Sequence, residues 1–300
     1  MQCCSADNTP ATPVVTAVAD NPAAQLELRF APDVGGVTRV VQRRVCYPYV
    51  FLKPFWFGDQ PTGIATAIIQ SSSGGLFGGE RLLQRLRLAP HAAVHLTNQA
   101  ATIVHAKRGH AATVQRVELE LGDNAYLEYL PEPVTLFPGA GLEQEVRVTL
   151  APQSVLLYAD GMLGHAPGGV EAAFAHYANC LEVYADDGRL LCAERSFVSG
   201  TDFVRSLHNT RGAWRACGLF VLAAPQERAR HEVWVNLLNE TLQAPGGADI
   251  YAASAPLPNQ AGVLCRIAAA DGAHLRAALE ACWRAARLDL TGAAAPRRRK

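Results

Sequence analysis

A glycine-rich segment in the first third of the chain has the spacing most suggestive of chemistry. Residues 71–80 read Ser-Ser-Ser-Gly-Gly-Leu-Phe-Gly-Gly-Glu, and the paired glycines are Gly74, Gly75, Gly78 and Gly79. Glycine adopts positive φ readily and allows another backbone to approach closely. No Gly-Lys-Ser/Thr follows, which excludes a P-loop, and the spacing differs from the dinucleotide fingerprint. We expect a turn that either places Glu80 at a cavity or interface or has a structural role alone.

The serines that open this segment, Ser71 to Ser73, suggest a second chemistry. A serine run followed by two glycines superficially resembles the loop of amidase-signature hydrolases, in which a lysine activates the nucleophilic serine. Here only Lys53 precedes the loop, and it is closer in sequence than the lysine of those enzymes. A serine hydrolase that uses Ser72 or Ser73 is therefore an alternative hypothesis.

Histidine is the next residue type that could bind a metal. Four histidines fall within twenty residues, on or near expected strands: His91, His95, His105 and His110. Positions four apart, such as His91 and His95, share one face of a strand, and neutral imidazoles bind divalent transition metals. No carboxylate lies nearby in sequence to orient them, which favours ordinary surface or core positions.

Two carboxylates, Glu128 and Glu132, lie on either side of Pro131 in the segment 127–140. A pair of carboxylates could act as in retaining glycosidases, but no aromatic sugar platform accompanies this one. A carboxylate inside an otherwise apolar strand needs a partner or water if it is buried. Glu128 is therefore either buried with such a partner, or it simply faces solvent or an arginine.

The aromatic segment 53–59 is a separate feature of the sequence. It fits a loop that binds a partner protein and a segment that fills the core equally well.

The composition excludes several function classes. The chain has 300 residues, 49% of them hydrophobic, and 27 basic side chains balance 27 acidic ones. A neutral chain lacks the basic footprint of nucleic-acid binding. No stretch approaches the roughly 18 apolar residues of a membrane span, and we see no signal-peptide pattern. The eight cysteines include no C-x-x-C pair, so we expect buried thiols in a reducing compartment, the cytoplasm.

Alternating polar and apolar residues predict the elements that position these candidates. Residues 114–121 alternate strictly and end at the turn signal Gly-Asp-Asn, and residues 181–184 and 189–192 flank the hairpin signal Asp-Asp-Gly. Further strands are expected at residues 25–30, 37–42, 45–47, 64–69, 81–88, 93–97, 126–130, 146–150 and 155–158. The regular spacing predicts a mainly β fold, one large multi-stranded domain.

Helical periodicity appears late in the chain. A helix is expected from Glu227 to about Asn239, and a clearer one over residues 273–287, where Leu275, Leu279, Cys282 and Ala286 form one apolar stripe after a capping Asp271. Residues 1–24 lack periodicity and are predicted to be a flexible tail, residues 25–292 the β-rich domain, and residues 293–300 a basic tail.

Three segments together resemble the urease accessory protein UreD (UreH) family. The loop 71–80 is similar to the family's Gly-Gly-x-x-Gly-Gly-Asp loop, residues 96–102 to its Leu-Thr-Thr-Gln-Ala-Ala-Thr segment, and residues 127–140 to its Leu-Glu-Trp-Leu-Pro-Gln…Phe-x-Gly-Ala segment. The resemblance runs from about Gln25 to Gly292 and is weaker in the second half. The chain departs from the family at Leu163-Gly164-His165, where an arginine is usual, and at Gly168-Gly169-Val170-Glu171, where Gly-Glu is usual.

The resemblance implies stacked β-sheets with a few helices and a role as a maturation scaffold with no catalysis of its own. It implies assembly with the accessory proteins UreF and UreG and with apo-urease, and passage of nickel towards urease through an internal polar passage. A passage needs weak serial ligands, since a tight site would trap the ion, so no tightly bound cofactor is expected. The passage residues that we predict are Glu80 and Glu128, by motif position, together with Asp59, Asp160 and Glu171. The alternative to an ion path is a pure interaction scaffold.

Overall fold

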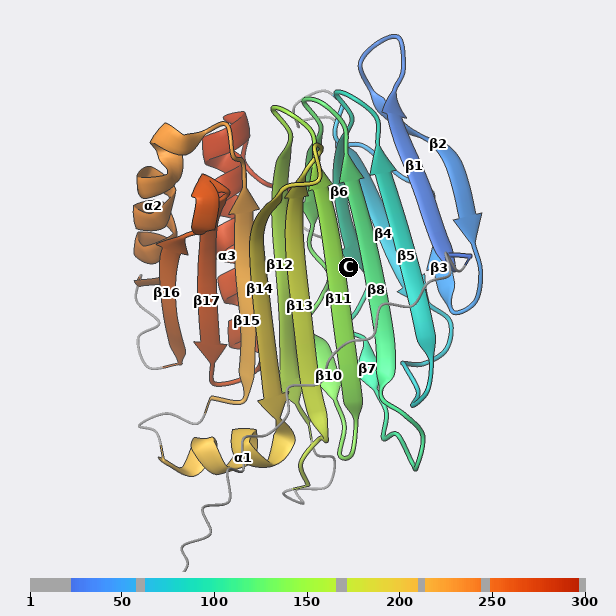
Figure 1. The fold of residues 1–300 in the computed structure, drawn as a ribbon, viewed down its shortest axis with the longest axis vertical. Helices are drawn as coiled ribbons and strands as arrows, with labels where there is room; N and C mark the ends of the chain where they lie inside the picture. Colours follow the sequence, from blue (N-terminus) through green and yellow to red (C-terminus); the bar gives the residue numbers. More distant parts are fainter. Residues whose placement is uncertain (1–22, 58–62, 166–171, 210–213, 244–248, 297–300) are drawn as a thin grey trace, which may run out of the picture.

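The chain forms two facing β-sheets with helices at one end (Figure 1). The structure is a computed structural model, and it describes residues 23–57, 63–165, 172–209, 214–243 and 249–296. The first sheet, sheet A, has seven strands in the spatial order β14 (Leu190–Ser199), β13 (His176–Ala185), β11 (Gly141–Leu150), β8 (Thr113–Leu121), β5 (Arg81–Leu88), β1 (Leu26–Pro32) and β2 (Thr38–Val45). The mainly β fold predicted from the sequence is thereby confirmed.

The second sheet, sheet B, runs alongside the first. Its main path is β16 (Ile250–Pro256), β17 (Gly262–Ala269), β15 (Ala216–Ala223), β12 (Val155–Gly164), β9 (Tyr126–Tyr129), β6 (Ala93–Asn98), β4 (Ala65–Ser71) and β3 (Tyr49–Phe51). The short strands β7 (Ile103–Val104) and β10 (Val134–Leu136) pair with each other, and β10 also pairs with β12.

The strand path resembles a solenoid. From β4 to β13 the chain passes back and forth between the sheets, so that β5, β8, β11 and β13 are parallel neighbours in one sheet and β4, β6, β9 and β12 in the other. Parallel strands need a long crossover connection, and here a strand of the opposite sheet supplies it. The outer strands of both sheets pair in antiparallel fashion.

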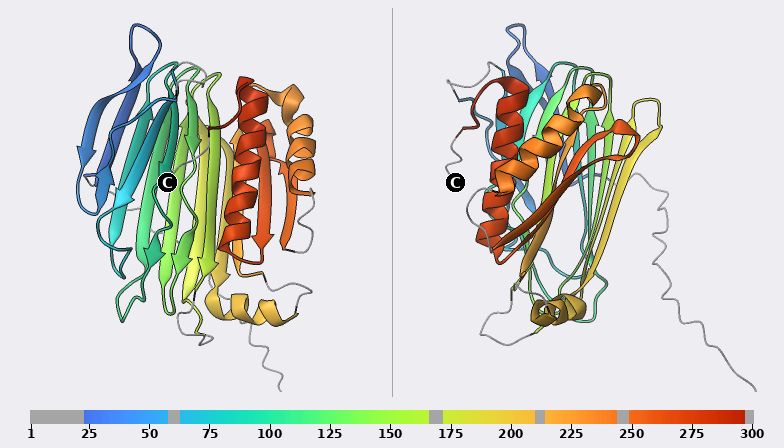
Figure 2. Two further views of the ribbon diagram at one scale, coloured as in Figure 1. Left: turned by 180° about the vertical axis from the view of Figure 1, so that it is seen from behind. Right: turned by 90° about the vertical axis from the view of Figure 1, so that its left-hand side faces the viewer.

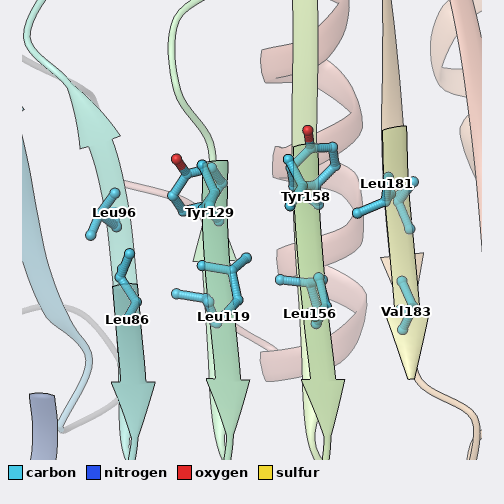
Figure 3. Packing of buried hydrophobic residues seen from close by; sticks show 14 of the residues in the cluster. Leu86, Leu96, Leu119, Tyr129, Leu156, Tyr158, Leu181 and Val183 are labelled. Atoms are coloured by element: carbon cyan, nitrogen blue, oxygen red, sulfur yellow. The ribbon is translucent and has the colours of Figure 1, made fainter. Parts of the chain in front are cut away.

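Two hydrophobic cores lie on the two faces of sheet B. The first fills the space between the sheets, and it includes Leu86, Leu96, Leu119, Leu156 and Leu181 (Figure 3). The second lies between sheet B and two helices, α2 (His231–Gln243) and α3 (Gly272–Thr291), which cover the outer face of this sheet (Figure 2). Both faces of the central strands of sheet B are therefore buried, which explains the nearly continuous apolar run in β12.

Helix α3 follows the predicted pattern. Its stripe of Leu275, Leu279, Cys282 and Ala286 is buried, and the Asp271 carboxylate caps it by accepting hydrogen bonds from the backbone N–H groups of Ala273 (2.8 Å) and His274 (2.9 Å). None of the helices in the described ranges combines the length and apolar character needed to cross a membrane.

Several predicted boundaries were wrong. The strand expected at residues 45–47 is a turn, because β2 ends at Val45 and the Tyr49 N–H bonds back to the Cys46 carbonyl (3.0 Å). The helix expected from Glu227 begins as a short 3-10 turn, Arg228–Arg230, before α2. Helix α1 (Gly200–Asn209) and a second 3-10 turn, Pro258–Gln260, were not predicted. Residues 1–22 and 297–300 of the predicted tails lie outside the described residues.

Candidate functional site

The glycine-rich loop packs directly against the segment that follows β7. A Cβ on Gly75 would lie 2.6 Å from the Ile103 carbonyl oxygen and 2.8 Å from His105 Nε2, and one on Gly78 would lie 2.6 Å from Lys107 Cα. Gly74, Gly75 and Gly79 also have positive φ. The loop therefore requires glycine for close backbone approach and for chain reversal.

Glu80 is the last residue of this loop, and its side chain bonds back to the loop backbone. Its Oε2 accepts a hydrogen bond from the Phe77 backbone N–H (2.9 Å), and the side chain is half-buried. The neighbouring imidazole of His105 stacks on Phe77, with ring centroids 4.6 Å apart. The hydrogen bond of Glu80 thus lies within its own turn and stabilises the conformation of that turn.

The serines of the loop have no catalytic partner among the described residues. Ser71 Oγ and Ser73 Oγ are 2.8 Å apart, Ser73 donates to the Gly75 carbonyl (2.6 Å), and Ser72 donates to the Pro48 carbonyl (3.1 Å). A serine nucleophile needs a base within hydrogen-bond reach. The hydrogen bonds observed here are those of turn residues and give no support to a hydrolase.

Glu128 is buried beneath helix α3. Its strand β9 alternates, so that Leu127 and Tyr129 enter the core between the sheets while Glu128 points to the helix side. His95 lies opposite it on β6 in the strand register, and His95 Nδ1 is 2.6 Å from Glu128 Oε2. Arg287 of α3 donates from one nitrogen to both carboxylate oxygens (3.0 and 2.8 Å), and the Tyr126 hydroxyl donates to Oε1 (2.6 Å).

This arrangement keeps Glu128 ionised in a dry site. The side chains of Glu128, His95 and Arg287 are 0%, 2% and 1% exposed. Burial alone would raise the pKa of Glu128, but the hydrogen bond from His95 and the positive charges of His95 and Arg287 outweigh it and lower that pKa below its ordinary value. We name Glu128, His95, Arg287 and Tyr126 the α3 anchor.

Glu132 also forms an ion pair with an arginine of α3. It is 7% exposed, and its Oε2 lies 3.3 Å from the Arg276 guanidinium of the same helix. The two glutamates on either side of Pro131 are thus each held by an arginine of α3. Arg287 was missed from the sequence, although it lies four residues after the buried Trp283 and so on the same face of the helix.

Asp160 lies on the other face of sheet B, between the two sheets. It follows Leu156 and Tyr158 at alternate positions of β12, both of which belong to the inter-sheet core. Its carboxylate accepts hydrogen bonds from Gln144 Nε2 on β11 (3.2 Å) and from the Tyr177 hydroxyl and Asn179 Nδ2 (2.5 Å) on β13. Within the described residues, no lysine, arginine or histidine pairs with it.

The surroundings of Asp160 differ electrostatically from those of Glu128. Burial raises the pKa of Asp160 above its ordinary value, because its hydrogen bonds come from neutral donors and offset only part of the desolvation. Two polar atoms beside it have no hydrogen-bond partner among the described residues, Asn179 Oδ1 and the Tyr158 hydroxyl. Buried polar atoms without partners call for an explanation such as water or an ion.

The polar groups continue across the sandwich beyond Asp160. The Tyr129 hydroxyl donates to Gln84 Oε1 (3.3 Å), and Gln84 Nε2 donates to the Tyr49 hydroxyl (3.1 Å). The rings of Tyr129 and Tyr158 are stacked with centroids 6.0 Å apart, and their hydroxyls point the same way (Figure 3). We call the whole set the inter-sheet polar belt: Tyr49, Gln84, Tyr129, Gln144, Tyr158, Asp160, Tyr177 and Asn179.

The tyrosines of the belt are neutral hydrogen-bonding groups. Burial raises the pKa of Tyr49 to about 12, and it raises the pKa values of Tyr129, Tyr158 and Tyr177 further. Amide and hydroxyl oxygens together with one carboxylate are hard ligands that bind divalent ions weakly unless several converge on one point. Within the described ranges, no group of three or more His, Cys, Asp or Glu side chains has an arrangement that could hold a metal.

The remaining predicted residues are scattered or lie outside the described residues. Asp59 and Glu171 are in the latter class. His91 is exposed in a turn with φ of 61°, whereas His95 is buried in β6. These are the ordinary surface and core positions that the sequence favoured, and the two side chains do not share one strand face. His165 follows β12, and its ring lies 5.6 Å from that of Phe137, centroid to centroid. The structure thus separates Glu80, Glu128 and Asp160 into a loop, the α3 anchor and the inter-sheet polar belt.

Comparison with known protein sequences identifies the family to which this chain belongs. Residues 22–300 match the family described as UreD urease accessory protein. This chain belongs to the UreD family. It is 36% identical over 273 residues to urease accessory protein UreD 1 of Pseudomonas syringae pv. syringae, covering 91% of this chain and 94% of that protein. It is 33% identical over 293 residues to UreD 1 of Methylorubrum populi, covering 97% and 96%.

UreD membership agrees with the resemblance drawn from the three segments. In this UreD chain the first segment is the glycine loop before β5, the second leads out of β6, and the third runs from β9 through β10 to the start of β11. The α3 anchor and the inter-sheet polar belt both draw on the strand of the third segment, through Glu128 and Tyr129 respectively. The motif thus belongs to the centre of the sandwich as well as to its loops.

Proposed function

We propose that this protein is a non-catalytic urease maturation scaffold that joins UreF, UreG and apo-urease and passes nickel between its two sheets. Family membership supports the accessory role, and the resemblance in the three motif segments supports these partners. We place this role in the cytoplasm, a proposal supported by the six cysteines of the described residues, all of which are free thiols.

The observation that carries the ion path is the inter-sheet polar belt. A nickel ion in transit needs oxygen or nitrogen ligands that bind one after another and release easily. Asp160 provides a buried carboxylate without a cationic partner in the described part of the chain, and Asn179 Oδ1 and the Tyr158 hydroxyl are free to bind beside it. The positive charge of a passing ion would relieve the cost of ionising Asp160. Nickel is cargo here, and no tightly bound cofactor is proposed.

The other residues predicted to line the passage are assigned different roles. Glu128 already has two basic side chains within hydrogen-bond distance, so we assign it to holding α3 and thereby the outer wall of the passage. Glu80 is proposed to act at the glycine loop, where it faces its own backbone. Asp59 and Glu171 stay predictions from the sequence.

Co-expression with urease subunits, UreF and UreG tests the proposal. Asp160→Asn should leave the accessory complex intact by size-exclusion chromatography but lower the nickel content of purified urease severalfold. Glu120→Gln is the matched control, because Glu120 faces outward on sheet A and pairs with the exposed Arg87. Glu80→Ala measures the loop separately.

Each outcome separates the hypotheses. Normal nickel content in Asp160→Asn, with the complex assembled, would favour a pure interaction scaffold without an ion path. Loss of the complex in Asp160→Asn would show that the residue acts on folding or assembly. Labelling of the purified protein by a serine-directed probe, abolished by Ser72→Ala or Ser73→Ala, would revive the hydrolase alternative.

A further inference from the structure

The edge formed by β2 and β3 differs in charge from the rest of the molecule. Residues 38–57, which contain both strands, carry Arg39, Arg43, Arg44 and Lys53 and neither an aspartate nor a glutamate. The whole chain has a formal net charge of zero. β2 is the last strand of sheet A and β3 the last strand of sheet B, on the same side of the molecule (Figure 1).

Three of the four cations of this edge have no ion-pair partner in the described part of the chain. The side chains of Arg43, Arg44 and Lys53 make no ion pair with another described residue, and only Arg39 is paired, with Asp33 (3.0 Å). Three arginines of the neighbouring strands do pair with glutamates, at 2.6 to 2.9 Å: Arg85 with Glu118, Arg87 with Glu27 and Glu120, and Arg116 with Glu145. Within the described residues, this edge thus carries three cations without an ion-pair partner, Arg43, Arg44 and Lys53.

Apolar side chains are exposed among these cations. Val41 is 56% exposed and Tyr47 66%, and Val50, Leu52 and Phe55 are each more than one-third exposed. Single exposed apolar residues are ordinary, but five within residues 41–55 form a cluster of the kind that marks interaction sites. We call residues 39–55 the basic edge.

Most of the backbone along the outer side of β2 is also available. Among the described residues β2 pairs only with β1. On its other side the Thr38 N–H donates to the Gly63 carbonyl (3.0 Å) and the Thr38 carbonyl accepts from Trp56 Nε1 (3.2 Å), and the groups further along this row have no strand partner in the described part of the chain. An edge strand of eight residues is a template for an added strand. Like charges on Arg43 and Arg44 oppose pairing with a second copy of the same edge, and they favour carboxylates instead.

We propose that the basic edge binds an extended segment of a partner protein in which acidic and apolar residues alternate, added to β2 as a further strand. The main-chain hydrogen bonds would supply affinity. Arg43 and Arg44 are consecutive and therefore lie on opposite faces of β2, so acidic side chains of the segment would meet one of them while its apolar side chains lie along the stem of the other. This inference does not depend on the proposed nickel passage.

The test uses capped, fluorescently labelled eight-residue peptides and the full-length protein, with binding followed by anisotropy. A peptide of alternating glutamate and valine should bind, and one of alternating lysine and valine should bind at least about tenfold more weakly. Higher salt should weaken binding of the glutamate peptide. Methylating alternate backbone nitrogens of that peptide, which removes the strand hydrogen bonds, should reduce its affinity by about tenfold or more.

Charge reversal locates the site. Arg43→Glu with Arg44→Glu should lower the affinity for the glutamate peptide by about tenfold or more. Arg189→Glu with Arg228→Glu, two exposed arginines away from the edge, changes the net charge equally and should leave the affinity unchanged. Arg43→Gln with Arg44→Gln gives a milder variant, and unfolding curves for each protein exclude misfolding as the cause.

Four outcomes would overturn the proposal. They are no binding of the glutamate peptide, equal binding of the lysine peptide, equal loss in the two double reversals, and full affinity for the methylated peptide. Dimerisation that Arg43→Glu with Arg44→Glu abolishes would instead assign the edge to a second copy. Binding seen only after deletion of residues 1–22 would assign it to the chain's own N-terminal segment.

Discussion

Glu128 and Asp160 are buried carboxylates on opposite faces of the same sheet, and their neighbours give them opposite properties. Glu128 faces helix α3 and has Arg287 and His95 within 2.8 Å. Asp160 faces the other sheet, and its hydrogen-bond partners among the described residues are amides and a tyrosine hydroxyl. The first pKa is lowered and the second raised. A buried carboxylate that is paired with cations stabilises the packing of its elements. A buried carboxylate without a counter-charge would be stabilised in its ionised form by an added cation.

The largest expected effect comes from breaking the α3 anchor. Glu128→Gln keeps the size of the side chain but leaves the charge of Arg287 buried without a carboxylate. Removing one partner of a buried ion pair costs about 3–5 kcal/mol, so the free energy of unfolding measured in urea should fall by that amount.

Glu280→Gln is the control for that variant. Glu280 pairs with Arg284 at 2.6 Å on the exposed side of the same helix, and an exposed pair of this spacing contributes about 0.3–0.5 kcal/mol. Equal losses in the two variants would mean that the α3 anchor contributes no more than a surface ion pair.

The hydroxyl of Tyr126 gives the next effect. Tyr126→Phe removes the hydrogen bond to Glu128 Oε1 (2.6 Å) while the ring remains. Hydrogen bonds to charged groups contribute about 1.5–3 kcal/mol, so urea unfolding should show a loss in that range. In the Glu128→Gln background the loss should shrink, since the two residues act together. An undiminished loss in the double variant would show that the hydroxyl acts independently of the carboxylate.

The sequence predicted the strands and the helix around the two carboxylates better than it predicted which side chains surround each carboxylate. The strand over 114–121, the hairpin turn at Asp186-Asp187-Gly188 and the apolar stripe of α3 follow from local periodicity. The partnership of Glu128 with Arg287 spans 159 residues, and no local pattern encodes it. Asp160 lies in a strand that is buried on both faces, so the alternation cannot tell which face meets the other sheet.

Changing pH should separate the two carboxylates by sign. The pKa of Glu128 is lowered from 4.5 on folding, so its contribution to stability is present above 4.5 and is lost as the pH falls through the folded value. The pKa of Asp160 is raised from 3.8, so the folded state is favoured below 3.8 and loses that advantage as the pH rises through the folded value.

Asp160→Asn tests this sign directly. The amide removes the charge, keeps one acceptor oxygen for Tyr177 and Asn179, and places its NH2 group where Gln144 can turn its own amide to present an oxygen. At neutral pH the variant should therefore be as stable as the natural protein or more stable, by about 1 kcal/mol or less. That difference should shrink as the pH approaches 3.8. Urea unfolding at a series of pH values measures it, with Glu128→Gln showing a deficit that shrinks in the same direction. A deficit for Asp160→Asn at neutral pH would mean that the hydrogen bonds to the charged carboxylate outweigh the cost of burying it.

The smallest effect on stability is expected at Tyr158, and it sharpens the contrast with Tyr126. The Tyr158 hydroxyl lies outside hydrogen-bond geometry with every described residue, although Asn179 and Gln144 lie near it, so Tyr158→Phe removes a buried polar group that gains little from the protein. Such a change is nearly neutral or stabilising, and urea unfolding should show a change of less than about 0.5 kcal/mol. If the hydroxyl lines an ion path, nickel loading of urease should fall although stability does not. A loss of stability comparable to that of Tyr126→Phe would instead mean that ordered water holds the hydroxyl as firmly as Glu128 holds its tyrosine.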